Sequence, residues 1–131
     1  MKISDLASRL AVSPHTLRYY EKRGLIRGVE RANGRRVYTR EDQTWMEFIL
    51  RLKATGMPLK QIQEYSDLRH EGDSTLSQRK AMLHSHRQDL EKNIQTLQSH
   101  LIALDQKIEI YDTLEEEYDT LRAGAEKTRG N

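Results

Sequence analysis

A group of cationic and aromatic side chains between residues 18 and 36 has the composition of a nucleic-acid contact. Arg18, Tyr19, Lys22 and Arg23 lie within one short segment, and the pair Arg35-Arg36 follows shortly after. A guanidinium can donate two parallel hydrogen bonds to guanine O6 and N7 or to a phosphate. Cations near the phosphates also supply much of the affinity for duplex DNA. These residue types therefore predict a surface that binds double-stranded DNA.

The side chains in this group are expected to divide between reading bases and holding phosphates. Arg18 and Tyr19 are the candidates for groove contacts. His15 is expected at a base edge or a phosphate, with an ordinary surface histidine as the equal alternative, and Tyr38 either donates to a phosphate or braces the hairpin. Lys60 fits a phosphate grip beside a helix N-terminus. The full set expected at the DNA is His15, Thr16, Arg18, Tyr19, Lys22, Arg23, Arg35, Arg36, Tyr38 and Lys60.

Two short helices and a hairpin must position these side chains. Apolar residues from Ile3 to Leu10 recur at i, i+3, i+4 and i+7, which predicts an amphipathic helix. Ser13-Pro14 is a helix-start signal, and Gly24 is suited to end the second helix. The pair predicts a helix-turn-helix, whose second helix enters the major groove. Asn33-Gly34 then predicts a type I′ turn between strands at 29–31 and 36–39.

Two further helices complete the compact part of the chain. Thr39 to Asp42 is typical of a helix N-terminus, and Gly56 is expected to end that helix. Pro58 is expected to open the next one. The inward-facing residues are expected to be Trp45, Phe48, Ile49, Leu52, Leu59, Ile62, Tyr65 and Leu68. The two aromatic residues of the first helix are interpreted as core and not as a base-stacking platform.

The remaining chain carries a heptad repeat. After a break at residues 71–73, Thr75 with Gln78 predicts a capping box, and the helix from there to Tyr118 would be about 66 Å long at ~1.5 Å per residue. A single helix cannot bury such a seam, so the pattern predicts a homodimeric coiled coil. A lone helix folded back on the front of the chain is the alternative. The expected dimerisation residues are Leu76, Leu83, Leu90, Ile94, Leu97, Leu101, Leu104, Ile108 and Tyr111.

Charge along this helix favours an antiparallel pair. Lys80 and Arg87 occupy seam positions near its start, and Glu115 occupies one near its end. Parallel helices would place like charges together, whereas antiparallel helices place each basic start beside the partner's acidic end. We therefore expect an antiparallel pair centred near Leu97. Each exposed pair contributes only ~1 kcal/mol or less, so orientation depends on the sum.

Composition excludes several other functions. Residues 1–60 hold 13 Lys/Arg and 6 Asp/Glu, a net +7, whereas residues 61–131 hold 9 and 14, a net −5. This asymmetry suggests that the front half meets a polyanion. The chain has no cysteine, which excludes disulfides, thiolate metal sites and thiol switches. Neither a signal-peptide pattern nor a membrane-spanning apolar run is present, so we expect a soluble, cytoplasmic protein.

The segments LRYYEKRGLI and NGRRVY, in this order, resemble the MerR family of bacterial transcription regulators. The resemblance implies a winged helix-turn-helix of four helices and a hairpin, joined to a long antiparallel dimerisation helix. It also implies a dimer that binds a pseudo-palindrome in a promoter spacer and bends and untwists it for RNA polymerase. Many relatives carry tyrosines where this chain has Arg35 and Val37, and a serine where it has Pro58.

The chain offers no obvious effector site. Metal-sensing relatives use cysteines, and His84 and His86 are about 200° apart on a helix, so they cannot share an ion. A weak site at residues 70–73 is a poorer interpretation than a solvated loop. The run Trp45 to Ile49 is similar to the aldehyde- and electrophile-responsive branch, several members of which sense through a cysteine near the position of Leu52. We expect no metal and no cofactor, and leave the effector unassigned.

The sequence thus predicts an all-α protein with a winged helix-turn-helix domain at 1–71, a coiled-coil helix at 74–120 and a flexible tail at 121–131. The expected function is that of a sequence-specific transcriptional regulator acting on promoter DNA as a homodimer. An architectural DNA-bending protein, such as a recombination or nucleoid factor, is the alternative. No nucleophile–base pair, phosphate-cradling glycine loop or metal cluster is present, so an enzyme is not expected.

Overall fold

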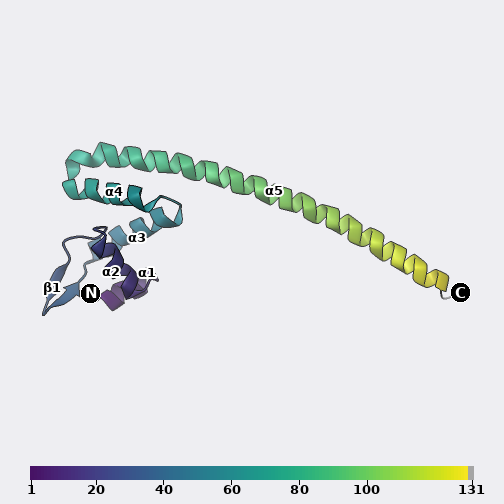
Figure 1. The fold of residues 1–131 in the computed structure, drawn as a ribbon, viewed down its shortest axis with the longest axis horizontal. Helices are drawn as coiled ribbons and strands as arrows, with labels where there is room; N and C mark the ends of the chain where they lie inside the picture. Colours follow the sequence, from purple (N-terminus) through teal and green to yellow (C-terminus); the bar gives the residue numbers. More distant parts are fainter. Residues whose placement is uncertain (130–131) are drawn as a thin grey trace. The chain divides into compact units, whose positions relative to one another are not determined.

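The computed structural model describes residues 1–129 and is helical except for one hairpin (Figure 1). Its elements are α1 (Ile3–Leu10), α2 (Pro14–Lys22), β1 (Glu30–Ala32), β2 (Arg35–Val37), α3 (Arg40–Ala54), α4 (Leu59–Glu71), the 3₁₀ turn η1 (Asp73–Thr75) and α5 (Leu76–Arg129). They fall into two compact units, one of residues 1–90 and one from residue 91 onward, and α5 contributes to both. We describe each unit by itself.

Helices α1 and α2 form the predicted helix-turn-helix. Ser13 Oγ accepts a hydrogen bond from the Thr16 backbone N–H at 3.1 Å, with Pro14 in the first helical position. Gly24, at φ +77°, follows the C-terminus of α2, and the next N–H, that of Leu25, bonds back to the Tyr20 carbonyl. This αL ending is a Schellman motif, which glycine adopts without steric strain.

The hairpin has the predicted turn, but both strands have other bounds than expected. Ala32 pairs with Arg35 across the two-residue loop, and Asn33 and Gly34 have φ of 53° and 76°. Positive φ at both central positions defines a type I′ turn, whose twist matches that of the strands. Because this loop leaves no room for a longer turn, the strands are Glu30–Ala32 and Arg35–Val37 instead of the expected 29–31 and 36–39.

Helices α3 and α4 supply most of the remaining core. Thr39 caps α3 by accepting from the Asp42 backbone N–H at 3.1 Å, while Asp42 accepts from Thr39 in return. Trp45 is 8% exposed and stacks on Tyr65 with ring centroids 5.7 Å apart, so it is a core residue as predicted. Phe48 is only half-buried, and the fully buried neighbour Met46 was not in the predicted stripe.

The junction between α4 and α5 differs from the prediction. Thr75 was expected to cap the long helix with Gln78. Its hydroxyl instead donates back to the carbonyls of Leu68, at 2.5 Å, and Gly72, at 2.8 Å. The carbonyls at the end of α4 lack helical partners, so the buried hydroxyl satisfies them instead.

Helix α5 also continues further than predicted. Residues 121–129 were expected to lie in a flexible tail, but they are helical through Arg129. Ala123, Ala125 and Glu126 are good helix formers, and Gly124 alone is too weak a breaker to end a long helix. The last two residues of the expected tail, Gly130 and Asn131, lie outside the described residues.

Candidate nucleic-acid interface

Helix α2 separates its buried and exposed faces as an exposed recognition helix requires. Leu17 and Tyr20 are buried, whereas Arg18 and Lys22 are exposed and Tyr19 is 41% exposed. His15 is also exposed, at the first turn of the helix. The helix thus presents its basic and aromatic side chains outward from a core anchor.

Some polar side chains on α2 are held by neighbours on the same helix. Arg23 Nε donates to the Tyr19 hydroxyl at 3.0 Å, and its guanidinium lies 5.3 Å from the Tyr19 ring centroid. The Thr16 hydroxyl, on a half-buried residue, lies 2.9 Å from Ser13 Oγ in the cap. Tyr19 and Arg23 therefore present one preorganised unit, and Thr16 serves the helix start.

Lys53 fixes α2 against α3. Its ammonium donates to the buried Tyr20 hydroxyl at 2.8 Å and lies 5.3 Å from the Tyr20 ring centroid. This hydrogen bond raises the pKa of Lys53 above its usual value. Sequence reasoning did not assign Lys53 this role, because nothing in the spacing of Tyr20 and Lys53 shows that the two side chains meet.

Arg36 connects the hairpin to α2. Its Nε lies 2.5 Å from Glu21 Oε2, and both side chains are mostly buried, at 30% and 21% exposed. Arg36 was predicted to hold a phosphate, but its charge is engaged by a carboxylate of the same chain. Its structural effect is to fix the hairpin beside the second helix.

A basic hollow of about 340 Å³ lies between the start of α1, α2 and the hairpin tip. Arg18 and Arg35 line it together with Arg36, and Lys2 adds a cation that the sequence analysis did not include. Within residues 1–129, Arg18, Lys22, Arg35 and Lys60 form no ion pair or side-chain hydrogen bond. These four cations are available to a polyanion. In the sequence, only its positive charge could have marked Lys2 as a member of this surface.

Tyr38 braces the hairpin from inside. The residue is 2% exposed, and within the described part of the chain its hydroxyl has no hydrogen-bond partner. Burial is the main cause that raises the pKa of Tyr38. Its backbone N–H donates to the Met1 carbonyl at 2.8 Å, which ties the end of the hairpin to the start of the chain. Of the two alternatives left open by the sequence, this burial favours bracing over phosphate contact.

Lys60 lies in the first turn of α4. The residue is exposed, and Pro58, at the cap position, provides no side-chain hydrogen bond to the helix start. The first N–H groups of α4 therefore remain available beside a lysine, as an anion contact requires.

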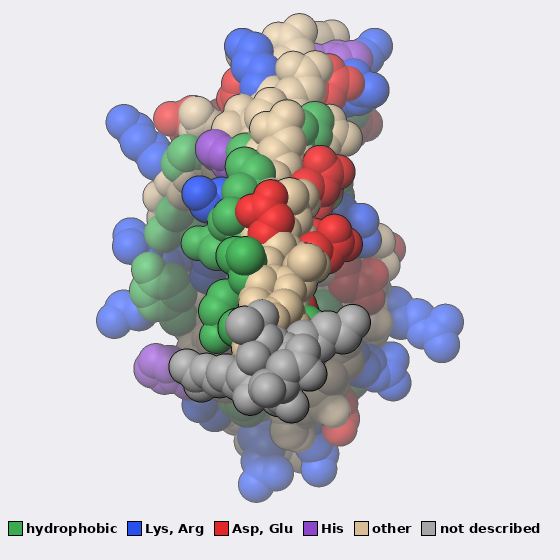
Figure 2. All heavy atoms as spheres, turned by 90° about the vertical axis from the view of Figure 1, so that its right-hand side faces the viewer, with side chains coloured by type: hydrophobic (Ala, Val, Ile, Leu, Met, Phe, Trp, Pro, Cys, Tyr) green, Lys and Arg blue, Asp and Glu red, His purple; other side chains and the backbone are tan. Residues whose placement is uncertain are grey.

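Helix α5 carries an apolar stripe that residues 91–126 of the same chain do not cover. Figure 2 shows hydrophobic side chains along one side of the helix and acidic ones along another. The predicted seam residues from Ile94 to Tyr111 are 45–67% exposed. Near the start, Leu76 is exposed and Leu90 half-buried, while Leu83 packs partly against the core of the first unit.

The C-terminal part of the stripe contains residues that the heptad missed. Leu114 and Leu121 are 50% and 74% exposed and alternate with Tyr111 and Tyr118 at helical spacing. A strict seven-residue repeat drifts around a straight α-helix, so Leu114, next to Glu115, comes to the apolar side. The stripe therefore stays continuous where the predicted seam placed a charge.

The described part of the chain has neither a metal cluster nor a membrane-spanning helix. Residues 1–129 contain no group of three or more His, Asp or Glu side chains that could hold a metal ion. No helix among them is long and apolar enough to cross a membrane. Leu52, at the position compared with a sensing cysteine, is 3% exposed in the core.

The helix-turn-helix, the type I′ hairpin and the two covering helices define a winged helix-turn-helix protein. The sequence matches the family described as "MerR HTH family regulatory protein" over residues 1–68 and the one described as "MerR, DNA binding" over residues 43–107. The chain belongs to the MerR family of transcriptional regulators. The family predicted from residues 17–38 is thereby confirmed, and its members are regulators, not enzymes.

Individual relatives agree with this assignment. The HTH-type transcriptional regulator AdhR of Bacillus subtilis is 41% identical over 91 residues, which are 69% of this chain and 65% of AdhR. The chain therefore spans less than two thirds of that relative. A putative MerR regulator from Listeria monocytogenes has a similar structure, with a TM-score of 0.87, 33% identity and coverage of 93% of this chain and 94% of that one.

A third relative was solved with DNA. HiNmlR, described as a MerR family regulator lacking the sensor domain, bound to promoter DNA, has a TM-score of 0.79 and 30% identity. The similarity covers 86% of this chain and 90% of that one.

Proposed function

We propose that the protein binds a pseudo-palindromic site in promoter DNA as an antiparallel homodimer and bends and untwists the duplex to control transcription. The observation that carries the proposal is a set of cations on α2 and the hairpin that have no ion pair or side-chain hydrogen bond among the described residues. Arg18 and Lys22 project from the second helix, and Arg35 lies at the hairpin tip. An unpaired, solvated guanidinium can bind a phosphate or guanine without first breaking an internal ion pair.

The contacts are assigned by their surroundings. Arg18 and Tyr19 read the groove, with His15 at a base edge or phosphate, while Lys22, Arg35 and Lys60 hold phosphates. Arg23 supports Tyr19 through its 3.0 Å hydrogen bond. Thr16, Arg36 and Tyr38 position these groups. The DNA in the HiNmlR complex supports a common binding mode, because that chain shares most of its length with this one.

The apolar stripe of α5 supports a dimer. Side chains such as Leu97, Leu101 and Leu104 are 59–67% exposed in the single chain, although burying each would release about 1.5–3 kcal/mol. A second copy supplies a matching stripe, and the basic start and acidic end of the helix favour the antiparallel arrangement. Such a dimer would present two α2 helices to one duplex at a fixed spacing.

Bending accounts for regulation at a distance from the contacts. Deforming a promoter spacer costs on the order of 1–6 kcal/mol, which contacts at both half-sites offset. RNA polymerase then responds to the altered spacing of its promoter elements without touching the regulator. Such a protein works where bacterial DNA is transcribed, in the cytoplasm.

Footprinting of sites selected from genomic fragments tests the proposal. We expect one two-fold symmetric protected region inside a promoter spacer, and a bend detected from the mobility of permuted fragments. Diffuse protection without a preferred site would instead indicate the architectural alternative. Two proteins should be compared, the natural chain and Arg18→Ala, because loss of one base contact should relax the preference at a single symmetric position.

A further inference from the structure

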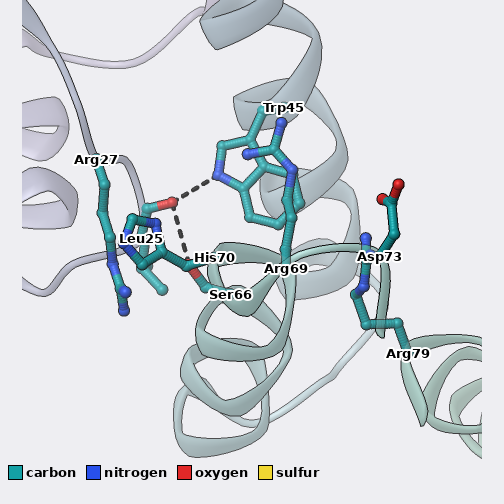
Figure 3. A pocket seen from close by; sticks show the side chains of 8 residues that line it. All are labelled: Leu25, Arg27, Trp45, Ser66, Arg69, His70, Asp73 and Arg79. Atoms are coloured by element: carbon teal, nitrogen blue, oxygen red, sulfur yellow. Dashed lines mark hydrogen bonds between the residues drawn. The ribbon is translucent and has the colours of Figure 1, made fainter. Parts of the chain in front are cut away.

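A polar pocket of about 360 Å³ lies within the first unit, away from the basic hollow at the hairpin. Figure 3 shows its walls: Leu25 and Arg27 follow α2, Trp45 comes from α3, and α4 supplies Ser66, Arg69 and His70. Asp73, in η1, and Arg79, near the start of α5, close it. Its volume lies at the small end of the ~300–1,000 Å³ range of small-molecule sites.

The pocket floor is rigidly built. Trp45 Nε1 donates to the Leu25 carbonyl at 2.6 Å, and Ser66 Oγ approaches the same oxygen at 3.4 Å (Figure 3). These bonds are buried, so they fix the segment after α2 against α3 and α4. A ligand here would meet a preformed wall, which lowers the entropy cost of binding.

Two guanidiniums in the pocket have no carboxylate partner among the described residues. The Arg69 guanidinium carbon lies over the Trp45 ring, 3.9 Å from its centroid. Arg79 donates to Thr75 Oγ at 3.0 Å and to the Gly72 carbonyl at 3.3 Å. Arg27, by contrast, is paired with Asp67. A guanidinium that lies over an aromatic ring can still donate its N–H groups to a planar oxyanion.

We propose that this pocket binds a small organic oxyanion, a carboxylate or phosphate ester, between Arg69 and Arg79. With Arg27 paired to Asp67, the pocket keeps Arg69, Arg79 and His70 against the single carboxylate of Asp73. The fork of each arginine matches the two oxygens of such a group. The pocket lining is mostly polar, which does not suit an uncharged apolar molecule.

Occupancy of the pocket is expected to affect DNA binding. Leu25 lies three residues after the helix that carries Arg18, and Arg79 lies on the helix that carries the apolar stripe. An anion that binds one arrangement of these elements more tightly shifts the population toward it. This regulatory half rests on the proposed function, whereas anion binding itself does not.

The single tryptophan of the chain provides the measurement, because Trp45 is in the pocket wall. We would titrate the intact protein with inorganic phosphate, pyrophosphate and citrate at constant ionic strength. Binding would be followed by tryptophan fluorescence and by the heat of binding in a calorimeter. At least one probe should saturate, with chloride giving no response. Arg79→Gln and Arg69→Gln should each lower the affinity for that probe by about tenfold or more, as expected for a lost charge-assisted hydrogen bond.

The control is Arg51→Gln, which removes an exposed arginine from α3 outside the pocket and should leave the affinity unchanged. The proposed site would be overturned if none of the three probes saturates. It would also be overturned if the Arg69 and Arg79 variants bind the probe as tightly as the natural chain does. Lower dimer stability of those variants without anion binding would assign the pocket to the subunit interface instead.

The regulatory half has a separate measurement. DNA affinity, established first without any anion, should change at least threefold when the saturating probe is added and should not change in Arg79→Gln. A protein that binds the anion with unchanged DNA affinity would contradict the regulatory half alone. A protein that binds no specific DNA under any condition would contradict the proposed function and leave the anion result standing.

Discussion

Arg36 Nε lies 2.5 Å from Glu21 Oε2, so an ion pair joins the hairpin to the second helix. Both side chains are mostly buried, which makes an unpaired partner costly. The geometry of the DNA surface therefore depends on a pair that need not touch DNA. Arg35, its neighbour, is exposed and without an ion pair in the described residues.

Removing this pair should affect stability before it affects recognition. We expect Arg36→Gln to lower the free energy of unfolding by ~1–3 kcal/mol, because it leaves the Glu21 carboxylate without its partner. Glu21→Gln should cost a similar amount, and the double variant less than the sum. Urea denaturation of the three variants measures the coupling. Strict additivity would show that the pair contributes nothing.

Arg18 and Arg35 should behave in the opposite way. Because each is exposed and has no ion pair among the described residues, Arg18→Ala and Arg35→Ala should change stability by no more than about 0.5 kcal/mol. Arg35→Ala should reduce the slope of log affinity against log salt by about 1 for a lost phosphate contact. Fluorescence anisotropy with the selected site over a salt series makes the measurement. An unchanged slope and affinity would remove Arg35 from the DNA surface.

Tyr38 distinguishes bracing from DNA contact. Its hydroxyl is buried without a partner in the described residues, so Tyr38→Phe should be neutral or stabilising by up to ~1 kcal/mol. DNA affinity should stay the same within about twofold, since the ring, which packs in the core, is retained. Tyr38→Ala should instead destabilise by about 3–5 kcal/mol through the cavity it leaves. A large loss of DNA affinity in Tyr38→Phe alone would restore the phosphate role.

The stability should fall at alkaline pH. Burial raises the pKa of Tyr38 and of Tyr65, and the Tyr20 hydrogen bond raises that of Lys53. Each group then keeps its proton in the folded state at a pH where the unfolded chain has released it. Unfolding releases protons there, so the contribution of these three groups to the free energy of unfolding is constant below about pH 10 and falls above it.

Urea denaturation over a pH series should show this fall, and Tyr65→Phe should make it shallower. The matched control is Tyr19→Phe, whose ring is 41% exposed, and its curve should run parallel to that of the natural chain. An equally steep fall in Tyr65→Phe would show that the buried phenol is not responsible.

Local signals in the sequence were sufficient for the starts of α2 and α3 and for the hairpin turn. Ser13-Pro14, Asn33-Gly34 and Thr39 each specify a cap or turn through their own backbone or side-chain chemistry, and the structure places them as predicted. The role predicted for Thr75 was wrong, because a buried hydroxyl can form hydrogen bonds with either the helix that follows it or the helix that precedes it. The choice depends on packing, which spacing does not reveal.

The site was predictable in composition but not in connectivity. Sequence reasoning identified Arg35 and Arg36 as equivalent cations, yet they lie in different surroundings, since the side chain of Arg36 reaches Glu21 across the fold. Similarly, Trp45 was correctly placed in the core, but the stacking of Arg69 on it joins α4 to α3 over a distance that no local pattern encodes. The DNA contacts and the dimer orientation remain predictions.

Cross-linking of introduced cysteines tests the antiparallel dimer most directly, because the natural chain has no cysteine to interfere. Mild oxidation of Lys80→Cys mixed with Glu115→Cys should give a covalent heterodimer that still binds the selected DNA site, while Lys80→Cys alone should remain uncross-linked. Efficient self-cross-linking of Lys80→Cys, with none between the two variants, would contradict the antiparallel arrangement and with it the proposed placement of two recognition helices on one duplex.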